Sequence, residues 1–387
     1  MRILQLGKFF PPDEGGVETA TLQISRGMVR RGAVCDVLCF ARTGPYADAD
    51  LPFAVTRAKT LGVVASTPLS LDYVRRLAVL APDYDILHVH MPNPMAALAL
   101  FLVRPKAAVS LHWHSDVIRQ KRLLALYRPL EKWCVRRAGL AVAPTATHLD
   151  ASDLAGFFAG KSLAVPFCVD ESFPSPEKAD LALTAAIRAR FPGKRIVFSL
   201  GRLIYYKGFE TLIEAAARLP GDYAVIIGGT GPLKDALAAR IAALGLEGRA
   251  ILAGRVPEAE LSSWYAACDL FCLPSTHRSE MFGIVMLEAM AFGKPIVSTA
   301  IPRSGVTWVN EDGVTGLTVP PGDPAALAAA IVKAGSDPAL YARFSGNCRL
   351  AVRERFSEGP VMDKLYAGFE RLSGAGGTPL RRSGGAV

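Results

Sequence analysis

The chain has 387 residues, 51% of them hydrophobic, and a formal net charge of +9. This length predicts two domains, because single hydrophobic cores rarely grow beyond about 250–300 residues. The longest apolar run, Met95–Val103, is too short for a membrane span, and the N-terminus lacks the pattern of a signal peptide, so we expect a cytoplasmic protein. No Lys or Arg run alternates with aromatic residues, so the charge favours anionic lipid or a phosphorylated substrate over nucleic acid.

The first half of the sequence alternates strands and helices. An amphipathic helix is expected over 17–32, and strands are expected over 2–9, 33–40, 86–91, 107–113 and 140–145. This alternation predicts a parallel sheet covered on both faces. The positive charge concentrates here, since residues 1–168 hold 20 Lys and Arg against 13 Asp and Glu, about +7.

A passage rich in Pro and Ser, Ala164–Lys178, separates this half from a second series of strands over 195–203, 223–231, 250–256, 269–275 and 295–299. The predicted fold class is therefore α/β, with two Rossmann-like parallel-sheet domains that face each other across a cleft. We expect an N-terminal acceptor-binding domain over 1–168 and a nucleotide-sugar-binding domain over 169–355. A helix over 356–372 would cross back to the first domain, and 373–387 would be a disordered tail.

Seven cysteines form no CxxC pair and lie mostly in apolar segments. This pattern favours reduced core thiols over a disulfide framework or a zinc site.

Two cations follow a predicted strand in "SLGRLIYYKG", namely Arg202 and Lys207, next to Gly201. A solvated pair of surface cations is the ordinary interpretation. Their position at the carboxyl edge of a parallel sheet instead favours an anion, because Arg offers a forked donor set and Lys a compact charge that suit a diphosphate.

Two further loops come after strands in the second half. The glycine cluster around Gly229 is weak evidence by itself, since glycine is the common solution for any tight turn. The loop at Arg255 and Val256 has a spacing that could hold a flat base.

The stretch "SEMFGIVMLEAMAFGKP" sets Glu280 and Glu288 around the start of a helix. One interpretation is an acid near the positive end of the helix dipole and an unrelated surface Glu. The other is a ligand site, with Gly283 admitting an anion to the open amides and both acids binding hydroxyls. A continuous helix would separate the two carboxylates by about 12 Å of rise, roughly the reach of a nucleotide sugar.

These segments together resemble the retaining glycosyltransferases of family 4, which have the GT-B fold. The resemblance rests on "GRLIYYKG", "GGTGPL", "AGRVPEAEL", "LPS" and "SEMFGIVMLEAMAFGKPIVST" in that order, with "PPDEGGVE" and "HWHSD" in the first half, and it covers residues 1–372. Within this family, the sequence is loosely similar to the bacterial polysaccharide and lipopolysaccharide mannosyltransferases.

The resemblance implies a role for each matching residue. Arg202 and Lys207 would bind the donor diphosphate, Glu280 the donor sugar and Glu288 the ribose. His114 would lie beside the transferred sugar, with His112 as the competing candidate. The other donor-binding residues would be Gly15 and Gly16 in a flexible closing loop, Gly201, Gly229, Arg255, Val256, and the amides of Phe282, Gly283 and Ile284. Met281 departs from the small residue that the family most often has there, which puts fine sugar specificity in doubt.

The implied activity is a retaining, metal-independent hexosyl transfer. The donor would be a nucleotide sugar, GDP-mannose before a UDP-sugar, and the acceptor a glycan or polyprenyl-linked glycan in cell-surface polysaccharide synthesis. No cofactor and no metal are expected, because Asp83 and Asp85 mimic a metal-binding DxD but lead straight into a buried strand. A sugar-nucleotide epimerase of related fold and a non-catalytic nucleotide-binding protein remain as alternatives.

Basic and apolar residues alternate along the segment 117–137. It is either an ordinary helix packed on the sheet or one whose basic outer face, including Arg119, Lys121 and Arg122, meets the inner surface of the cytoplasmic membrane. In both cases Leu126 belongs to the packed apolar face.

Overall fold

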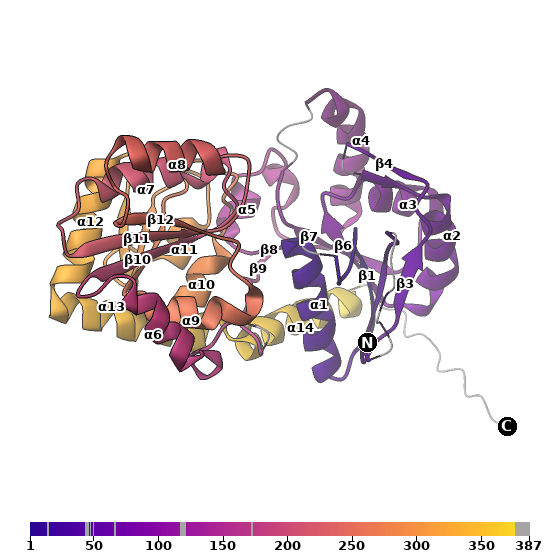
Figure 1. Ribbon diagram of the computed structural model, residues 1–387. Coiled ribbons are helices and arrows are strands. Elements are labelled where there is room, and N and C mark those ends of the chain that lie inside the picture. The colour runs from indigo at the N-terminus through magenta and orange to yellow at the C-terminus, as the bar shows by residue number, and fades with distance from the viewer. Residues whose placement is uncertain are drawn as a thin grey trace. The chain divides into compact units, whose positions relative to one another are not determined.

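The computed structural model describes residues 1–13, 15–42, 46, 48, 50–65, 67–116, 121–171 and 173–375, without the side chains of 121–123 and 375. The chain divides into two compact units, which Figure 1 colours along the sequence. Unit 1 joins Met1–Pro166 to the C-terminal segment from Gly359, and unit 2 is Phe167–Glu358. Each unit holds a parallel sheet with helices around it, which confirms the predicted pair of Rossmann-like domains.

In the described part of unit 1, seven parallel strands have the order β3-β2-β1-β6-β7-β8-β9. They are β1 Arg2–Leu6, β2 Val34–Phe40, β3 Val55–Ala58, β6 Ile86–Met91, β7 Ala108–Trp113, β8 Leu140–Ala143 and β9 Ser162–Ala164, with a separate hairpin of β4 Gly62–Val64 and β5 Thr67–Leu69. The helices are α1 Gly16–Arg30, α2 Leu71–Leu80, α3 Pro94–Val103, α4 Lys121–Arg137, α5 Ala146–Asp150 and α14 Glu358–Ala375, with short turns η1 Ala81–Asp83 and η2 Ala155–Phe157.

In unit 2, six parallel strands among the described residues have the order β12-β11-β10-β13-β14-β15. They are β10 Arg195–Leu200, β11 Tyr223–Gly228, β12 Ala250–Gly254, β13 Leu270–Leu273, β14 Ile296–Thr299 and β15 Gly316–Val319. The helices are α6 Leu181–Ala189, α7 Phe209–Ala216, α8 Lys234–Ala243, α9 Leu261–Ala267, α10 Ile284–Ala291, α11 Val306–Val309, α12 Pro324–Ser336 and α13 Pro338–Ala351. Shorter turns are η3 Pro176–Lys178, η4 Tyr205–Lys207, η5 Glu258–Glu260 and η6 Val352–Phe356.

Helix α14 packs on unit 1 although it follows unit 2 in the sequence. Its buried residue Met362 lies against Gly27 of α1, where a Cβ would come within 2.6 Å of the Met362 side chain. Asp363 accepts a hydrogen bond from Arg31 at 2.8 Å. The helix continues through Ala375, so the expected end of the ordered chain at Leu372 is wrong, because the last turn extends the packed helix.

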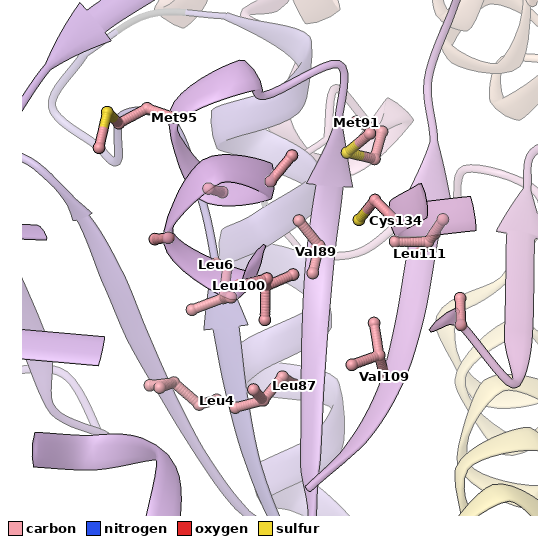
Figure 2. Packing of buried hydrophobic residues seen from close by; sticks show 14 of the residues in the cluster. Leu4, Leu6, Leu87, Val89, Met91, Met95, Leu100, Val109, Leu111 and Cys134 are labelled. Atoms are coloured by element: carbon pink, nitrogen blue, oxygen red, sulfur yellow. The ribbon is translucent and has the colours of Figure 1, made fainter. Parts of the chain in front are cut away.

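The core of unit 1 follows the alternation of its strands. Figure 2 shows side chains of β6 on one face of the sheet, where Leu87 and Val89 lie near Leu100 of α3 and Met91 lies near Cys134 of α4. The intervening residues of β6 therefore face the opposite side of the sheet. All of these side chains are buried.

The cysteines behave as expected from their apolar neighbours. All seven are buried and unpaired, which confirms the prediction of reduced core thiols. Burial raises the pKa of Cys35 and Cys134 to about 12, so these groups are protonated thiols at neutral pH. In the part of the chain that the structure describes, no helix is both long and apolar enough to cross a bilayer.

Candidate functional site

The carboxyl edge of the unit 2 sheet brings Lys207 and Glu280 together. The Lys207 Nζ lies 2.7 Å from Glu280 Oε2, and the two side chains are only 12% and 10% exposed. Ser275, just beyond β13, donates to the same oxygen at 2.8 Å. Ser304 donates to the Glu280 backbone carbonyl. Two donors on one carboxylate oxygen and a third on the backbone hold Glu280 in one orientation.

The loops that follow β10 and β11 touch through their backbones. Gly229 has a φ of 135°, and a Cβ there would lie 1.9 Å from the Gly201 carbonyl oxygen. Only glycine allows this approach and this conformation. The loop after β10 also meets the loop after β13, because the Thr276 amide donates to the Tyr206 carbonyl at 2.8 Å. Gly201 and Gly229, both predicted site residues, thus allow the loops after β10 and β11 to pack closely against each other.

Helix α10 begins where the sequence predicted a ligand. Gly283 precedes it with a φ of 79°, and a Cβ there would meet Leu273 at 2.7 Å. Among the described residues, no oxygen accepts a hydrogen bond from the amides of Phe282, Gly283 or Ile284. Such amides at the positive end of a helix are suited to bind an anion.

The two glutamates do not share one helix. Residues 280–283 precede α10, so the continuous helix that was assumed between the two glutamates is wrong, and Glu280 belongs to the loop after β13. Glu288 lies within α10, and its Oε2 accepts a hydrogen bond from the Tyr265 hydroxyl of α9. Burial, and secondarily the negative charge of Glu258, raise the pKa of Glu288, while the Tyr265 bond opposes this rise. The two carboxylates therefore have different partners and different electrostatics.

The other donor-binding candidates lie at the same ends of the strands. Arg202 follows β10 and Arg255 follows β12, and both side chains are exposed. Val256 is partly buried and packs on the core. These positions leave both guanidinium groups accessible to a ligand.

In unit 1 the predicted residues occupy the carboxyl edge of the other sheet. Gly15 and Gly16 lie at the N-terminus of α1. His114 directly follows β7, and its Nε2 lies 2.9 Å from Nδ1 of His90. His112 is on β7 itself and lies 3.3 Å from His88. Of the two competing histidines, His114 is the partly exposed one and His112 is buried.

The DxD-like pair lies at the other edge of this sheet. Asp83 ends η1 and Asp85 immediately precedes β6, so both are at the amino ends of the strands. The Asp85 carboxylate accepts from the Arg2 amide at 2.8 Å. This contact gives Asp85 a structural role in joining β1 to β6.

The sequence analysis missed the partners that hold these residues. Ser304 and Tyr265 have no sequence signal of their own, because they are ordinary residues whose role depends on the fold. Ser275 lies in the "LPS" segment of the resemblance, but its bond to Glu280 was not foreseen. His90 could have been found, since the alternation in "ILHVHM" and "SLHWH" places the histidines on one face of neighbouring strands.

The structure tests the expectation for helix α4 only in part. Arg119 lies outside the described residues, and the side chains of Lys121 and Arg122 are not described. Arg128 pairs with buried Glu131 at 3.0 Å. Leu126, expected on the packed face, is 81% exposed, because Tyr127, Leu130 and Trp133 are the residues that face the core.

Comparisons with known proteins identify the family to which the chain belongs. Residues 14–172 match the model of Glycosyltransferase Family 4, and residues 184–350 match that of Glycosyl transferases group 1. The chain is 32% identical over 369 residues to an O-antigen chain mannosyltransferase C of Escherichia coli, covering 94% of this chain and 96% of the relative. It is also 32% identical over 363 residues to a D-rhamnosyltransferase WbpZ of Pseudomonas aeruginosa, covering 92% of each.

Solved structures share the fold. HepE of Anabaena in complex with UDP superposes with a TM-score of 0.77 at 24% identity, covering 96% of this chain and 100% of that one. The family models and the near full-length identity to curated relatives confirm the resemblance seen in the sequence: the chain belongs to the group 1 and family 4 glycosyltransferases.

Proposed function

We propose that the protein is a retaining glycosyltransferase that moves a hexose from a nucleotide-diphosphate sugar to a glycan or lipid-linked glycan in cell-surface polysaccharide synthesis. The observation that carries the proposal is the arrangement of Lys207, Glu280 and the open amides before α10 around one sheet edge. It offers cationic and amide donors for a diphosphate beside a fixed carboxylate for a sugar hydroxyl.

The chemistry follows from those groups. Negative charge grows on the diphosphate as the sugar bond breaks, and Lys207, Arg202 and the helix amides would offset it. The acceptor hydroxyl would attack from the face that the diphosphate leaves, and the departing phosphate would take its proton. This route retains the configuration of the sugar, and in it the cations and amides do the work that a divalent metal would otherwise do.

The donor assignment places GDP-mannose first and a UDP-sugar second. The name of the E. coli relative supports mannose and an O-antigen acceptor, whereas the HepE complex supports UDP. An epimerase would require an internal acid/base array beside the sugar, and a non-catalytic binding protein would be expected to have lost Arg202, Lys207 or Glu280.

The test is release of nucleoside diphosphate from a panel of sugar nucleotides with and without a lipid-linked glycan acceptor. Release that requires the acceptor supports transfer. Conversion of the sugar without an acceptor would identify an epimerase, and stabilisation by a nucleotide without any turnover would identify a binding protein. Thermal stabilisation selects the donor beforehand, since a ligand at 100 times its Kd adds about 2.7 kcal/mol.

We also propose that unit 1 binds an anionic membrane through an apolar surface on α3 and α4, the two helices that pack side by side. The exposed large apolar residues described in these two helices are Leu98, Phe101 and Leu102 of α3 and Leu126 of α4. Exposed Arg104 and Lys106 follow α3 and would meet anionic headgroups.

The membrane prediction is tested by co-sedimentation with vesicles. Leu102→Ser with Leu126→Ser should weaken binding to anionic vesicles at least tenfold, since burying a leucine is worth about 1.5–3 kcal/mol. Leu181→Ser is the matched control, because Leu181 is 83% exposed but lies on α6 of unit 2. Binding should fall as salt rises. Equal binding by the double variant and the wild type would reject this surface.

A further inference from the structure

One face of the unit 1 sheet carries a cluster of polar side chains that lead to His114. Because side chains alternate along a strand, this face is the one opposite the apolar residues of Figure 2. Neighbouring strands bring the residues into register, since Gln5 pairs with His88 and His90 pairs with His112. The histidine cluster consists of His88, His90, His112 and His114, with Gln5 and Ser110 beside it.

Three of these histidines are close enough to raise the question of a metal site. Ring nitrogens of His90, His112 and His114 lie within 4.8 Å of one another. However, the rings of His112 and His114 are 10° from parallel with centroids 4.4 Å apart, so they stack face to face. A metal ion lies in the plane of each imidazole that binds it, and two stacked planes share no such position. The cluster is better described by its hydrogen bonds.

His90 and His114 form one such bond in good geometry. Their rings are 13° from parallel with centroids 5.2 Å apart, and the bonded nitrogens are 2.9 Å apart. These values place the rings edge to edge in nearly one plane, which is the arrangement of a linear hydrogen bond. The remaining question is which nitrogen donates.

Gln5 and Thr21, which contact the other nitrogen of His90, fix the donor and the acceptor of this hydrogen bond. The Gln5 Nε2 donates to the Thr21 carbonyl at 3.0 Å, so the Gln5 Oε1 faces His90 Nε2 at 2.7 Å. The Thr21 hydroxyl donates to the Val17 carbonyl at 2.8 Å, so its oxygen can only accept from the same His90 nitrogen, 3.3 Å away. Two acceptors face His90 Nε2, which must therefore carry the proton.

The proton on His90 then determines the state of His114. Burial, with the nearby His88 and His112, lowers the pKa of His90 well below 6.5, so His90 is neutral and its Nδ1 has a lone pair. His114 must donate to that lone pair from Nε2. Neutral His114 consequently has its own lone pair on Nδ1. An amide cannot take up a proton, so the chain ends at Gln5 and orients His114 without relaying protons.

We propose that Gln5 and His90 are positioning residues that fix His114 as the Nε2–H tautomer. The part that this tautomer plays in transfer rests on the proposed function, in which His114 lies beside the transferred sugar. The opposite tautomer would lose the hydrogen bond to His90 and, with it, the orientation of the His114 ring.

The test is the nitrogen NMR spectrum of the full chain labelled with ¹⁵N-histidine, in which the two neutral tautomers give different patterns. His114→Gln assigns the signals of His114. In the wild type we expect a single Nε2–H tautomer for His90 and His114. Gln5→Met, which keeps the size but loses the acceptor, should give His114 a mixture of tautomers and lower kcat about tenfold, the value of one lost hydrogen bond.

Ser110→Ala is the matched control, because Ser110 is buried in the same cluster but bonds His88 at 3.1 Å. It should leave the His114 signals and kcat unchanged. An Nδ1–H pattern for His114 in the wild type would overturn the proposal without any variant, as would an unchanged pattern in folded Gln5→Met. The spectra need no substrate, so a locked tautomer in a chain without transferase activity would reject the proposed function and support the positioning role.

Discussion

Arg202→Ala is expected to lower kcat by a factor of roughly 100 to 1000, while the Kd of the sugar nucleotide changes much less, because the guanidinium offsets charge that appears only as the diphosphate leaves. Arg202 is exposed, so the variant should unfold at the wild-type temperature. Steady-state kinetics with the donor chosen by thermal stabilisation, together with the Tm, measures both quantities.

Lys207→Ala should lose turnover to a similar extent and should also lose stability. Its ammonium neutralises Glu280 in a nearly buried pair, and removing one partner of such a pair costs about 3–5 kcal/mol. Arg190→Ala serves as the control for both, since Arg190 is an exposed arginine of unit 2 that caps α6 before the amino end of β10. Near-normal turnover in Arg202→Ala or Lys207→Ala would rule out the proposed role in leaving-group stabilisation.

The sequence predicted the main strands because their cores are continuous apolar runs. The expected strand over 86–91 coincides with β6, and the expected strand over 195–203 contains β10 with the loop that carries Arg202. Short edge strands such as β9 and β15 were missed. They contain few residues and pair on one side only, so tertiary contacts rather than local pattern determine them.

The candidate site was predictable where backbone geometry leaves a trace in the sequence. Gly229 and Gly283 had to be glycine, because each has a positive φ and a close neighbour. The partner of Glu280 was not predictable, since Lys207 lies 73 positions away and the contact exists only when β10 and β13 pair. Leu126 was wrongly predicted to be packed. Helical spacing shows that a helix has an apolar face, but it does not show which residues at the edge of that face are covered.

Glu280→Gln and Glu288→Gln are expected to damage different steps. Both described contacts of the Glu280 carboxylate go to Oε2, which leaves Oε1 for a sugar hydroxyl. Glu280→Gln should therefore slow transfer by roughly 10- to 100-fold, the value of a charged hydrogen bond, and leave the Kd of the free nucleoside diphosphate nearly unchanged. Glu288→Gln should instead weaken the binding of the free nucleoside diphosphate about tenfold, since Glu288 is assigned to the ribose. Calorimetric titration and steady-state kinetics separate the two, and equal effects on free-nucleotide binding would contradict the assignment.

The stability of Glu288→Gln gives a second, independent readout of the same assignment. Burial raises the pKa of Glu288 above its ordinary 4.5, so the folded state holds this proton more tightly than the unfolded state does. The stability that such a group contributes is present at low pH and is lost as the pH rises through its folded-state pKa, so Glu288 lowers the stability of the protein relative to a neutral side chain as the pH rises. Glutamine is neutral at every pH, and its oxygen can still accept from Tyr265. At pH 7 the variant should keep or raise its Tm while its nucleotide affinity falls, which is the behaviour of a carboxylate retained for binding. A lower Tm with unchanged affinity would assign Glu288 to the fold alone.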